Sequence, residues 1–336
     1  MKRSGVNVQS ARAPKRPVAS ETTSVRLDKA YADYLKWQDL WGYSKATQRD
    51  YRVNVGAFVQ FHAQTRSDAL LREIKASDFE AYLLSVHQRE VSRRYLRSIY
   101  QHVKTFFNWC VRTERIEVNP LAKYPPPKVP KTRKRAPSID MVKEILALPY
   151  CSEKHMPGLR RRAMIHMLVD CGGARVSELA AMKVSDVADA EWFPLKTIRI
   201  GLGKGQRERR APFTRAARQA MALYLEKRKA PDSPDKWRAS PYLWITEWGE
   251  QFKASGISLD FDRLFRHAGL RDQIKDRTHA FRRTFAVESI RAGKGRLATA
   301  AAGGWLDLNT LDNYTAGELD DEAAMLAAFE DHNPLR

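Results

Sequence analysis

The chain has 336 residues, 43% of them hydrophobic, which is enough to build two or three domains with buried cores and excludes a disordered protein. Its 59 Lys and Arg residues outnumber its 39 Asp and Glu residues, and the net charge of +20 favours a polyanionic partner. Nucleic acid fits this charge best. An acidic membrane surface is the alternative, but no apolar run approaches the ~18 residues of a membrane span. The three cysteines are isolated, which argues against a disulfide framework or a zinc site. Because the N-terminus has no apolar signal core either, we expect a cytoplasmic protein.

Residues 1–23 form a basic N-terminal tail without an acidic residue in its first 20 positions. The tail is too short to fold as a separate DNA-binding domain. The first interpretation is a disordered, solvated segment, and the second is an arm that follows a DNA backbone. Both can hold.

Residues 24–122 have apolar side chains at spacings of three and four, which is typical of amphipathic helices. We expect one helix from about residue 27, a second opened by Ser44, a third capped by Ser77 or Asp78, and a fourth from Ser92 to about residues 119–120. The aromatic side chains of this region are predicted to form its core. Basic side chains on the exposed faces either keep the surface soluble or clamp a DNA backbone: Arg93, Arg94, Arg97 and Lys104.

Residues 123–136 form a linker with four prolines, six basic residues and no acidic residue. Proline keeps such a segment extended. A neutral spacer would not need this charge, so we expect the linker to cross a phosphate backbone; a nuclear-localisation signal is the weaker alternative. The residues that would contact DNA here are Lys131, Arg133, Lys134 and Arg135.

Residues 137–336 are predicted to form a second domain of helices with a short β region. Two strands are expected at 197–200 and 210–213, joined by a glycine-rich turn. A pair of glycines, Gly172 and Gly173, should end the helix before them. The helices are expected at 139–148, 160–171, from about 177, at 214–229, at 258–268, from about 278 and at 320–329, with a loop at 231–241. The chain is thus predicted to be mainly α with a small antiparallel β region.

Three segments of this domain carry side chains suited to chemistry on a phosphate. They are CGGARVSEL at 171–179, THAFRRTFA at 278–286, and the stretch from GGW at 303–305 to DNY at 312–314. His279 and Arg282 are three residues apart, so both can lie on one face of a helix that Thr278 caps.

Together, in this order and with nine residues from Trp305 to Tyr314, these segments resemble the tyrosine recombinase (phage integrase) family. The resemblance implies that residues 24–122 are the family's helical core-binding domain and that residues 137–336 are its α+β catalytic domain. The helix at 320–329 would then pack on its own domain or dock into a neighbouring subunit.

The resemblance implies a catalytic role for Arg175, Lys204, His279, Arg282, Trp305 and Tyr314. The two arginines suit a phosphate, because guanidinium binds its oxygens bidentately and stays charged. Tyr314 stands where the family carries its nucleophile, and its phenol, with a pKa of ~10, needs a base or local positive charge.

His279 is the candidate base or phosphate donor, and Glu178 has a supporting role beside Arg175. Lys204, in the turn between the strands, either protonates the leaving 5′-oxygen or is an ordinary exposed lysine. Trp305 can donate a hydrogen bond but cannot transfer a proton. Contacts to the DNA backbone are also expected from Arg207, Arg209, Arg210 and Arg283.

The implied function is site-specific DNA recombination: double-stranded DNA is cleaved and rejoined through a 3′-phosphotyrosyl intermediate, in a homotetramer that holds two DNA sites. No metal and no cofactor is expected, because the intermediate keeps the bond energy. Accessory DNA-bending proteins are a further class of partner that the sequence does not reveal. The alternatives are a type IB topoisomerase or telomere-resolving enzyme with the same residues, and a non-catalytic DNA-binding protein of the same fold.

Overall fold

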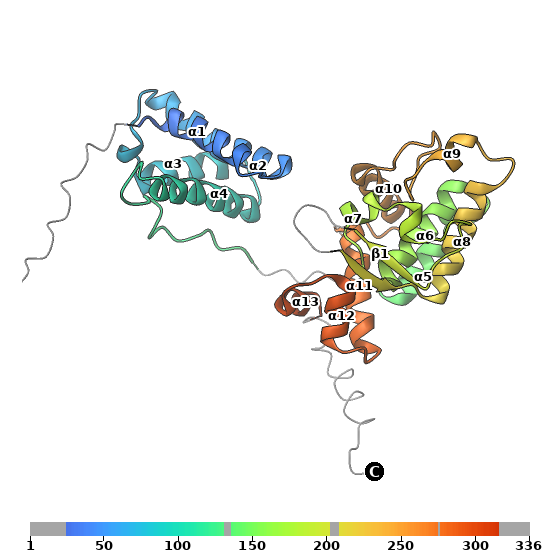
Figure 1. Cartoon of the computed structure of the whole chain (residues 1–336). Coiled ribbons are helices and arrows are strands. Elements are labelled where there is room, and N and C mark those ends of the chain that lie inside the picture. Colours follow the sequence, from blue (N-terminus) through green and yellow to red (C-terminus); the bar gives the residue numbers. More distant parts are fainter. Residues whose placement is uncertain (1–24, 131–135, 202–207, 275, 316–336) are drawn as a thin grey trace, which may run out of the picture. The chain divides into compact units, whose positions relative to one another are not determined.

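The computed structural model describes residues 25–130, 136–201, 208–274 and 276–315. The chain divides into two compact units, Met1–Lys131 and Thr132–Arg336, called here the N-terminal and C-terminal units (Figure 1). The division falls inside the proline-rich and basic segment at 123–136. Several expectations lie outside the described residues: those for the basic tail, the helix at 320–329, Lys131, Arg133, Lys134, Arg135, Lys204 and Arg207.

The N-terminal unit is a bundle of helices around an aromatic core. Helix α2 contacts α1, α3 and α4, and α4 also contacts α1 and α3. Each of these helices contributes fully buried aromatic side chains, namely Tyr34, Phe58, Phe79, Phe106 and Phe107. The elements are α1 (Leu27–Leu40), α2 (Lys45–Thr65), the 3-10 turn η1 (Leu71–Glu73), α3 (Ala76–His87) and α4 (Arg93–Arg112).

Serine caps open two of these helices as predicted. The Ser44 hydroxyl accepts from the Thr47 N–H at 3.1 Å, and the Ser92 hydroxyl accepts from the Tyr95 N–H at 3.2 Å.

The predicted start of α3 and end of α4 were wrong. Helix α3 begins one residue before Ser77, and the Asp78 carboxylate accepts from the Lys75 N–H at 2.7 Å, as a third-position acid of a capping box does. Helix α4 ends at Arg112 rather than near residue 119, because Glu114 takes a left-handed conformation with φ 56°.

The C-terminal unit consists of helices and a two-stranded antiparallel sheet, in which Ile198 pairs with Ala211 and Arg199 pairs with Arg210. Its helices before the sheet are α5 (Ile139–Ala147), α6 (Met156–Asp170) and α7 (Val176–Ala181), with 3-10 turns η2 (Pro149–Cys151) and η3 (Val184–Asp186). The strands are β1 (Thr197–Ile200) and β2 (Arg209–Pro212). The later helices are α8 (Arg215–Lys229), α9 (Asp235–Ala239), α10 (Ala254–His267), α11 (Arg277–Arg291), α12 (Arg296–Gly303) and α13 (Leu308–Thr315).

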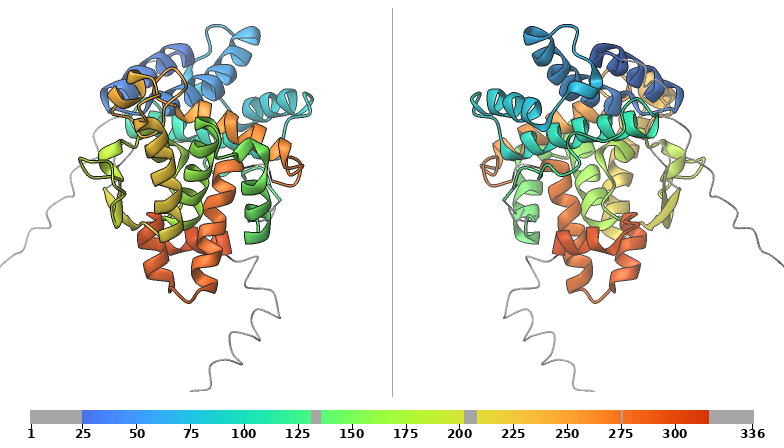
Figure 2. Two further views of the ribbon diagram at one scale, coloured as in Figure 1. Left: turned by 90° about the vertical axis from the view of Figure 1, so that its right-hand side faces the viewer. Right: turned by 90° about the vertical axis from the view of Figure 1, so that its left-hand side faces the viewer.

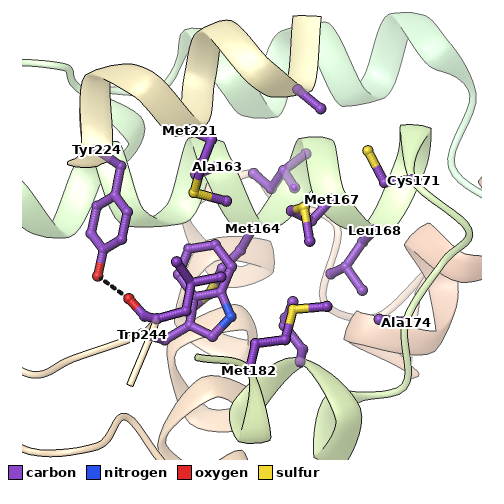
Figure 3. Packing of buried hydrophobic residues seen from close by; sticks show 14 of the residues in the cluster. Ala163, Met164, Met167, Leu168, Cys171, Ala174, Met182, Met221, Tyr224 and Trp244 are labelled. Carbon is purple, nitrogen blue, oxygen red and sulfur yellow. Dashed lines mark hydrogen bonds between the residues drawn. The ribbon is translucent and has the colours of Figure 1, made fainter. Parts of the chain in front are cut away.

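Helix α6 is the centre of the main core, where it packs against α8 and α11. Figure 3 shows Met164 of α6 beside Met221 of α8 and the Trp244 side chain, and Leu168 of α6 on the side of Ala174. A second, smaller cluster lies beside it, formed by α11, α12 and α13. Figure 2 shows α12 and α13, in red, against one end of α11. The prediction of a mainly helical chain with a small antiparallel β region is confirmed.

Several boundaries differ from the predicted ones. Helix α6 begins at Met156, because the His155 ring accepts from the Gly158 N–H at 3.0 Å and Pro157 fits the first turn. Helix α10 begins at Ala254 instead of 258, and α9 lies in the predicted loop at 231–241.

Thr278 is not an N-cap, since α11 already begins at Arg277. The short helices α12 and α13 were not predicted. Among the described residues no helix is long and apolar enough to cross a membrane.

Candidate active site

The segment before α7 positions Arg175. Gly172 and Gly173 follow α6 with φ of 80° and 53°, which glycine adopts at little cost. Both also permit close contacts: a Cβ at Gly172 would lie 2.4 Å from the Ala302 carbonyl oxygen, and one at Gly173 would lie 3.0 Å from Arg282. The prediction that these glycines end the helix is confirmed. They also bring the segment before α7 against Arg282 of α11 and Ala302 of α12.

Glu178 holds Arg175 in place. Its carboxylate accepts from Arg175 Nη1 at 2.6 Å and from the Arg175 backbone N–H at 2.9 Å, while Arg209 Nη2 donates to the same carboxylate at 2.9 Å. Glu178 is only 2% exposed. Burial alone would raise the pKa of this carboxyl, but the hydrogen bonds from Arg209 and from the Arg175 backbone outweigh it, so the pKa lies below its ordinary value.

Arg282 is buried and fixed by main-chain carbonyls. Its guanidinium donates to the Gly173 carbonyl oxygen and, at 2.6 Å, to that of Gly303, and it lies 4.2 Å from the centre of the Trp305 ring. Arg282 is 1% exposed. Burial, followed by the positive charge of Arg175, lowers its pKa to about 10, so it is still charged at neutral pH. Two guanidinium groups with mutual electrostatic influence are suited to a shared anion.

Trp305 connects Arg282 to Tyr314. The indole stacks on Phe285 at a centroid distance of 6.2 Å, and its centroid lies 5.5 Å from that of Tyr314. A Cβ at Gly303 would lie 1.9 Å from the indole, so this glycine makes room for Trp305. Tyr314 lies in α13 and is half-buried. The structure therefore brings together Arg175, Glu178, Arg282, Trp305 and Tyr314 from separate elements.

His279 lies in the first turn of α11 and is exposed, in contrast to Arg282. It lines a pocket together with Asp262, Asp276 and Arg277. Lys204, the remaining residue of the predicted catalytic set, lies outside the described residues.

The predicted DNA-contacting residues divide by burial. Arg93, Arg94 and Arg97 at the start of α4 and Arg210 in β2 are exposed. Lys104 is half-buried and donates to the Tyr100 hydroxyl at 2.8 Å and to the Ala122 carbonyl at 3.2 Å.

Two arginines do not fit the expected surface position. Arg283 is buried, with Nη1 3.7 Å from the Asp276 carboxylate, and burial lowers its pKa. Arg209 is buried against Glu178, so its guanidinium contacts the protein rather than solvent. The strand alternation of Arg209, Arg210 and Ala211 was the signal for this: Arg209 lies on the same face as the buried Ala211, and Arg210 faces away.

The chain is similar to known proteins both in sequence and in fold. The model of the phage integrase family matches residues 141–319, which is more than half of the chain. The tyrosine recombinase XerC of Bacillus pumilus is 25% identical over 315 residues, covering 93% of this chain and 98% of the relative.

Two solved structures share the fold at low identity. The Tn1549 transposon integrase, in complex with a circular intermediate DNA, has a TM-score of 0.68 and 18% identity, covering 92% of this chain and 99% of that one. The lambda integrase, solved as a tetramer bound to a Holliday junction, has a TM-score of 0.67 and 19% identity, covering 87% of this chain and 78% of that one.

The chain belongs to the phage integrase family. Within this family it is a site-specific tyrosine recombinase, an enzyme that breaks and joins DNA strands.

Proposed function

We propose that Tyr314 is the nucleophile of DNA cleavage and that Arg175 and Arg282 bind the phosphate that it attacks. The observation that carries this proposal is how the side chains are grouped. Glu178 binds Arg175, the positive charge of Arg175 acts on Arg282, and Arg282 lies over the ring of Trp305, which lies against Tyr314. Arg282 is held rigidly by two carbonyls, and Arg175 is held by Glu178. Such pre-positioned charge stabilises a transition state without reorganisation during the reaction.

The reaction is a phosphoryl transfer. The Tyr314 Oη attacks the phosphorus, the bond from phosphorus to the 5′-oxygen breaks, and a 3′-phosphotyrosyl bond forms. The phenolic proton passes to His279, which is exposed near the start of α11, and the 5′-oxygen takes a proton from Lys204. Trp305 donates through its indole N–H to a phosphate oxygen.

Strand exchange follows when the 5′-hydroxyl of a partner strand attacks the phosphotyrosyl bond and releases Tyr314. The proposal includes a homotetramer on two double-stranded DNA sites, and the similar lambda integrase, solved as a tetramer bound to a Holliday junction, supports it. Accessory DNA-bending proteins and a cytoplasmic location belong to the same proposal. Residues 24–122, which lie within the N-terminal unit, are proposed as the core-binding domain, with Arg93, Arg94 and Arg97 on the DNA backbone.

The test is capture of covalent protein–DNA adducts from cells under denaturing conditions, followed by sequencing of the attached DNA. We expect adducts at one short site with inverted repeats for the wild type and none for Tyr314→Phe. The matched control is Tyr150→Phe, which removes a hydroxyl from another tyrosine of the C-terminal unit but keeps the ring beneath Arg161. It should yield the same adducts as the wild type.

Other outcomes favour the alternatives. Adducts scattered without sequence preference, and lost in Tyr314→Phe, would favour a topoisomerase. The absence of adducts from both the wild type and Tyr314→Phe, with DNA binding intact, would favour a non-catalytic DNA-binding protein and refute the proposed chemistry.

A further inference from the structure

Arg209 joins two parts of the candidate site that are far apart in the sequence. Its Nη2 donates to Glu178 Oε2 at 2.9 Å, and its Nε donates to the Ala302 carbonyl oxygen at 3.1 Å. The side chain is only 11% exposed. One planar guanidinium in β2 therefore links the start of α7 to the end of α12.

The first contact acts on Arg175. Glu178 is buried and shared between Arg175 and Arg209, so each arginine neutralises part of the cost of burying the carboxylate. Without Arg209, the carboxylate would keep its contacts to Arg175 but lose the strongest of the interactions that hold it ionised. The carboxylate that holds Arg175 is therefore kept charged by a residue that lies 34 positions beyond Arg175.

The second contact acts on Trp305. The last carbonyls of an α-helix have no partner within the helix. In α12, Arg209 binds the carbonyl of Ala302 and Arg282 binds that of Gly303. Gly304 follows in a left-handed conformation with φ 65°, and a Cβ there would lie 2.9 Å from the Arg209 guanidinium. This contact sets the path of the chain into Trp305, whose ring lies against Tyr314.

We propose that Arg209 is a positioning residue that holds the two halves of the active site together. It positions the phosphate-binding Arg175 through Glu178, and it positions the Trp305–Tyr314 pair through the end of α12. This inference rests on the proposed function, because it assumes that Arg175 and Tyr314 carry the reaction. It also assigns β2 a part in catalysis that does not require contact with DNA.

The first experiment separates cleavage from binding. The substrate is a nicked duplex that carries the site recovered by adduct capture, and the variants are Arg209→Ala, Arg209→Lys and Arg199→Ala. Arg199 is the matched control, since it is an arginine of the same hairpin paired with a carboxylate, Asp186, but half-exposed. Each variant is measured for its single-turnover cleavage rate at saturating protein and for its DNA Kd as a function of salt.

We expect Arg209→Ala to cleave on the order of 10- to 100-fold more slowly, the range found when a partner that orients a metal ligand is removed, because Arg209 has the same orienting task here. Its Kd and salt dependence should match those of the wild type. Arg209→Lys should recover only part of the rate, because one ammonium group cannot reproduce the two contacts. Arg199→Ala should cleave at the wild-type rate.

If Arg209 instead binds a DNA phosphate, the salt slope of Arg209→Ala falls by about 1 and cleavage at saturating protein is normal, which would overturn the inference. A wild-type rate with a wild-type Kd would overturn it equally.

The pH profile gives a readout that a merely structural role would not change. Removal of Arg209 leaves Glu178 buried with fewer donors, so the pKa of its carboxyl rises and it becomes protonated at a higher pH. The acid limb of the cleavage rate should therefore lie at a higher pH in Arg209→Ala than in the wild type. The shift should disappear in a Glu178→Gln background, and the rate losses of the two substitutions should not multiply.

Two checks keep the inference testable. If thermal unfolding shows that Arg209→Ala does not fold, Arg209→Lys takes its place. We then expect slower cleavage and a pH shift in the same direction. A wild-type rate and a wild-type pH profile would contradict the inference. Tyr314→Phe separates a failure of the proposed function from a failure of the role proposed for Arg209. Cleavage by Tyr314→Phe would refute the proposed function, whereas an inactive Tyr314→Phe with fully active Arg209 variants would refute only the role of Arg209.

Discussion

Trp305 should stabilise α12 and α13 without contributing much to the main core. The indole is 6% exposed and belongs to the small cluster with Phe285, Ala300 and Leu311. Truncation of a buried Trp to Ala costs about 3–5 kcal/mol. That range already includes the free energy of losing most of the packing contacts of the ring. The ring centre also lies 4.2 Å from the buried Arg282 guanidinium, and a desolvated cation–π contact contributes about 2 kcal/mol. We therefore expect Trp305→Ala to fall in the upper half of the range.

This loss is comparable with the total stability of many domains, about 5–15 kcal/mol. Because the affected cluster is separate from the core around α6, the loss should appear first as local opening of α12 and α13. At 1.4 kcal/mol for each factor of ten, a loss in the upper half of that range should lower the hydrogen-exchange protection of these helices by about 10³- to 10⁴-fold. Protection of α6 should change little.

The assay is hydrogen exchange followed by mass spectrometry on wild type, Trp305→Ala and Trp305→Phe. The phenylalanine variant keeps an aromatic ring over Arg282 and should lose less protection. Trp248→Ala is the matched control, because Trp248 is a tryptophan of the same unit that is 75% exposed. Equal protection of α12 and α13 in the wild type and in Trp305→Ala would refute this reasoning.

Three further predictions concern the site and the DNA-facing surface. The pKa of the Glu178 carboxyl is lower in the folded protein than its ordinary value of 4.5, so its charge stabilises the fold above pH 4.5. This stabilisation is lost as the pH falls through the pKa of the folded state. The free energy of unfolding in urea should therefore depend less on pH below 4.5 in Glu178→Gln than in the wild type. Gly304→Ala should lower the free energy of unfolding by at least about 1 kcal/mol, because φ of residue 304 is 65° and the new Cβ meets Arg209. It should also slow cleavage and leave the Kd for DNA unchanged. An unchanged melting temperature would contradict the close contact. Arg93→Ala and Arg94→Ala should each lower the salt slope of DNA binding by about 1, with single-turnover cleavage at saturating protein unaltered; slopes equal to the wild type would remove α4 from the proposed DNA interface.

Local signals in the sequence predicted most of the larger helices. The serines that open α2, α4 and α5 accept backbone hydrogen bonds within their own first turns, so sequence spacing suffices to identify them. The short helices α12 and α13 were missed because each has only eight residues, too few for stability without docking on α11. Their positions depend on tertiary contacts that no local pattern contains.

The candidate site shows the same division. Arg175 and Glu178 are three residues apart and meet within one turn of chain, as their spacing indicated. Arg209 lies 31 residues beyond Glu178, so its ion pair depends on how β2 packs, and charge alone suggested a surface residue. The roles of Trp305 and Tyr314 were predicted through resemblance to a family rather than through physical reasoning, and the contact between their rings was not predicted.

The central claim, that Tyr314 becomes covalently joined to DNA, can be tested on one peptide. Trypsin should release residues 297–336 as a single peptide, because no Lys or Arg lies between Arg296 and Arg336, and Tyr314 is its only tyrosine. After nuclease digestion of a trapped adduct, mass spectrometry should find this peptide carrying a phosphodeoxynucleotide, with fragment ions placing it on Tyr314. A nucleotide on another peptide, or an unmodified 297–336 peptide in a preparation that contains the adduct, would contradict the account.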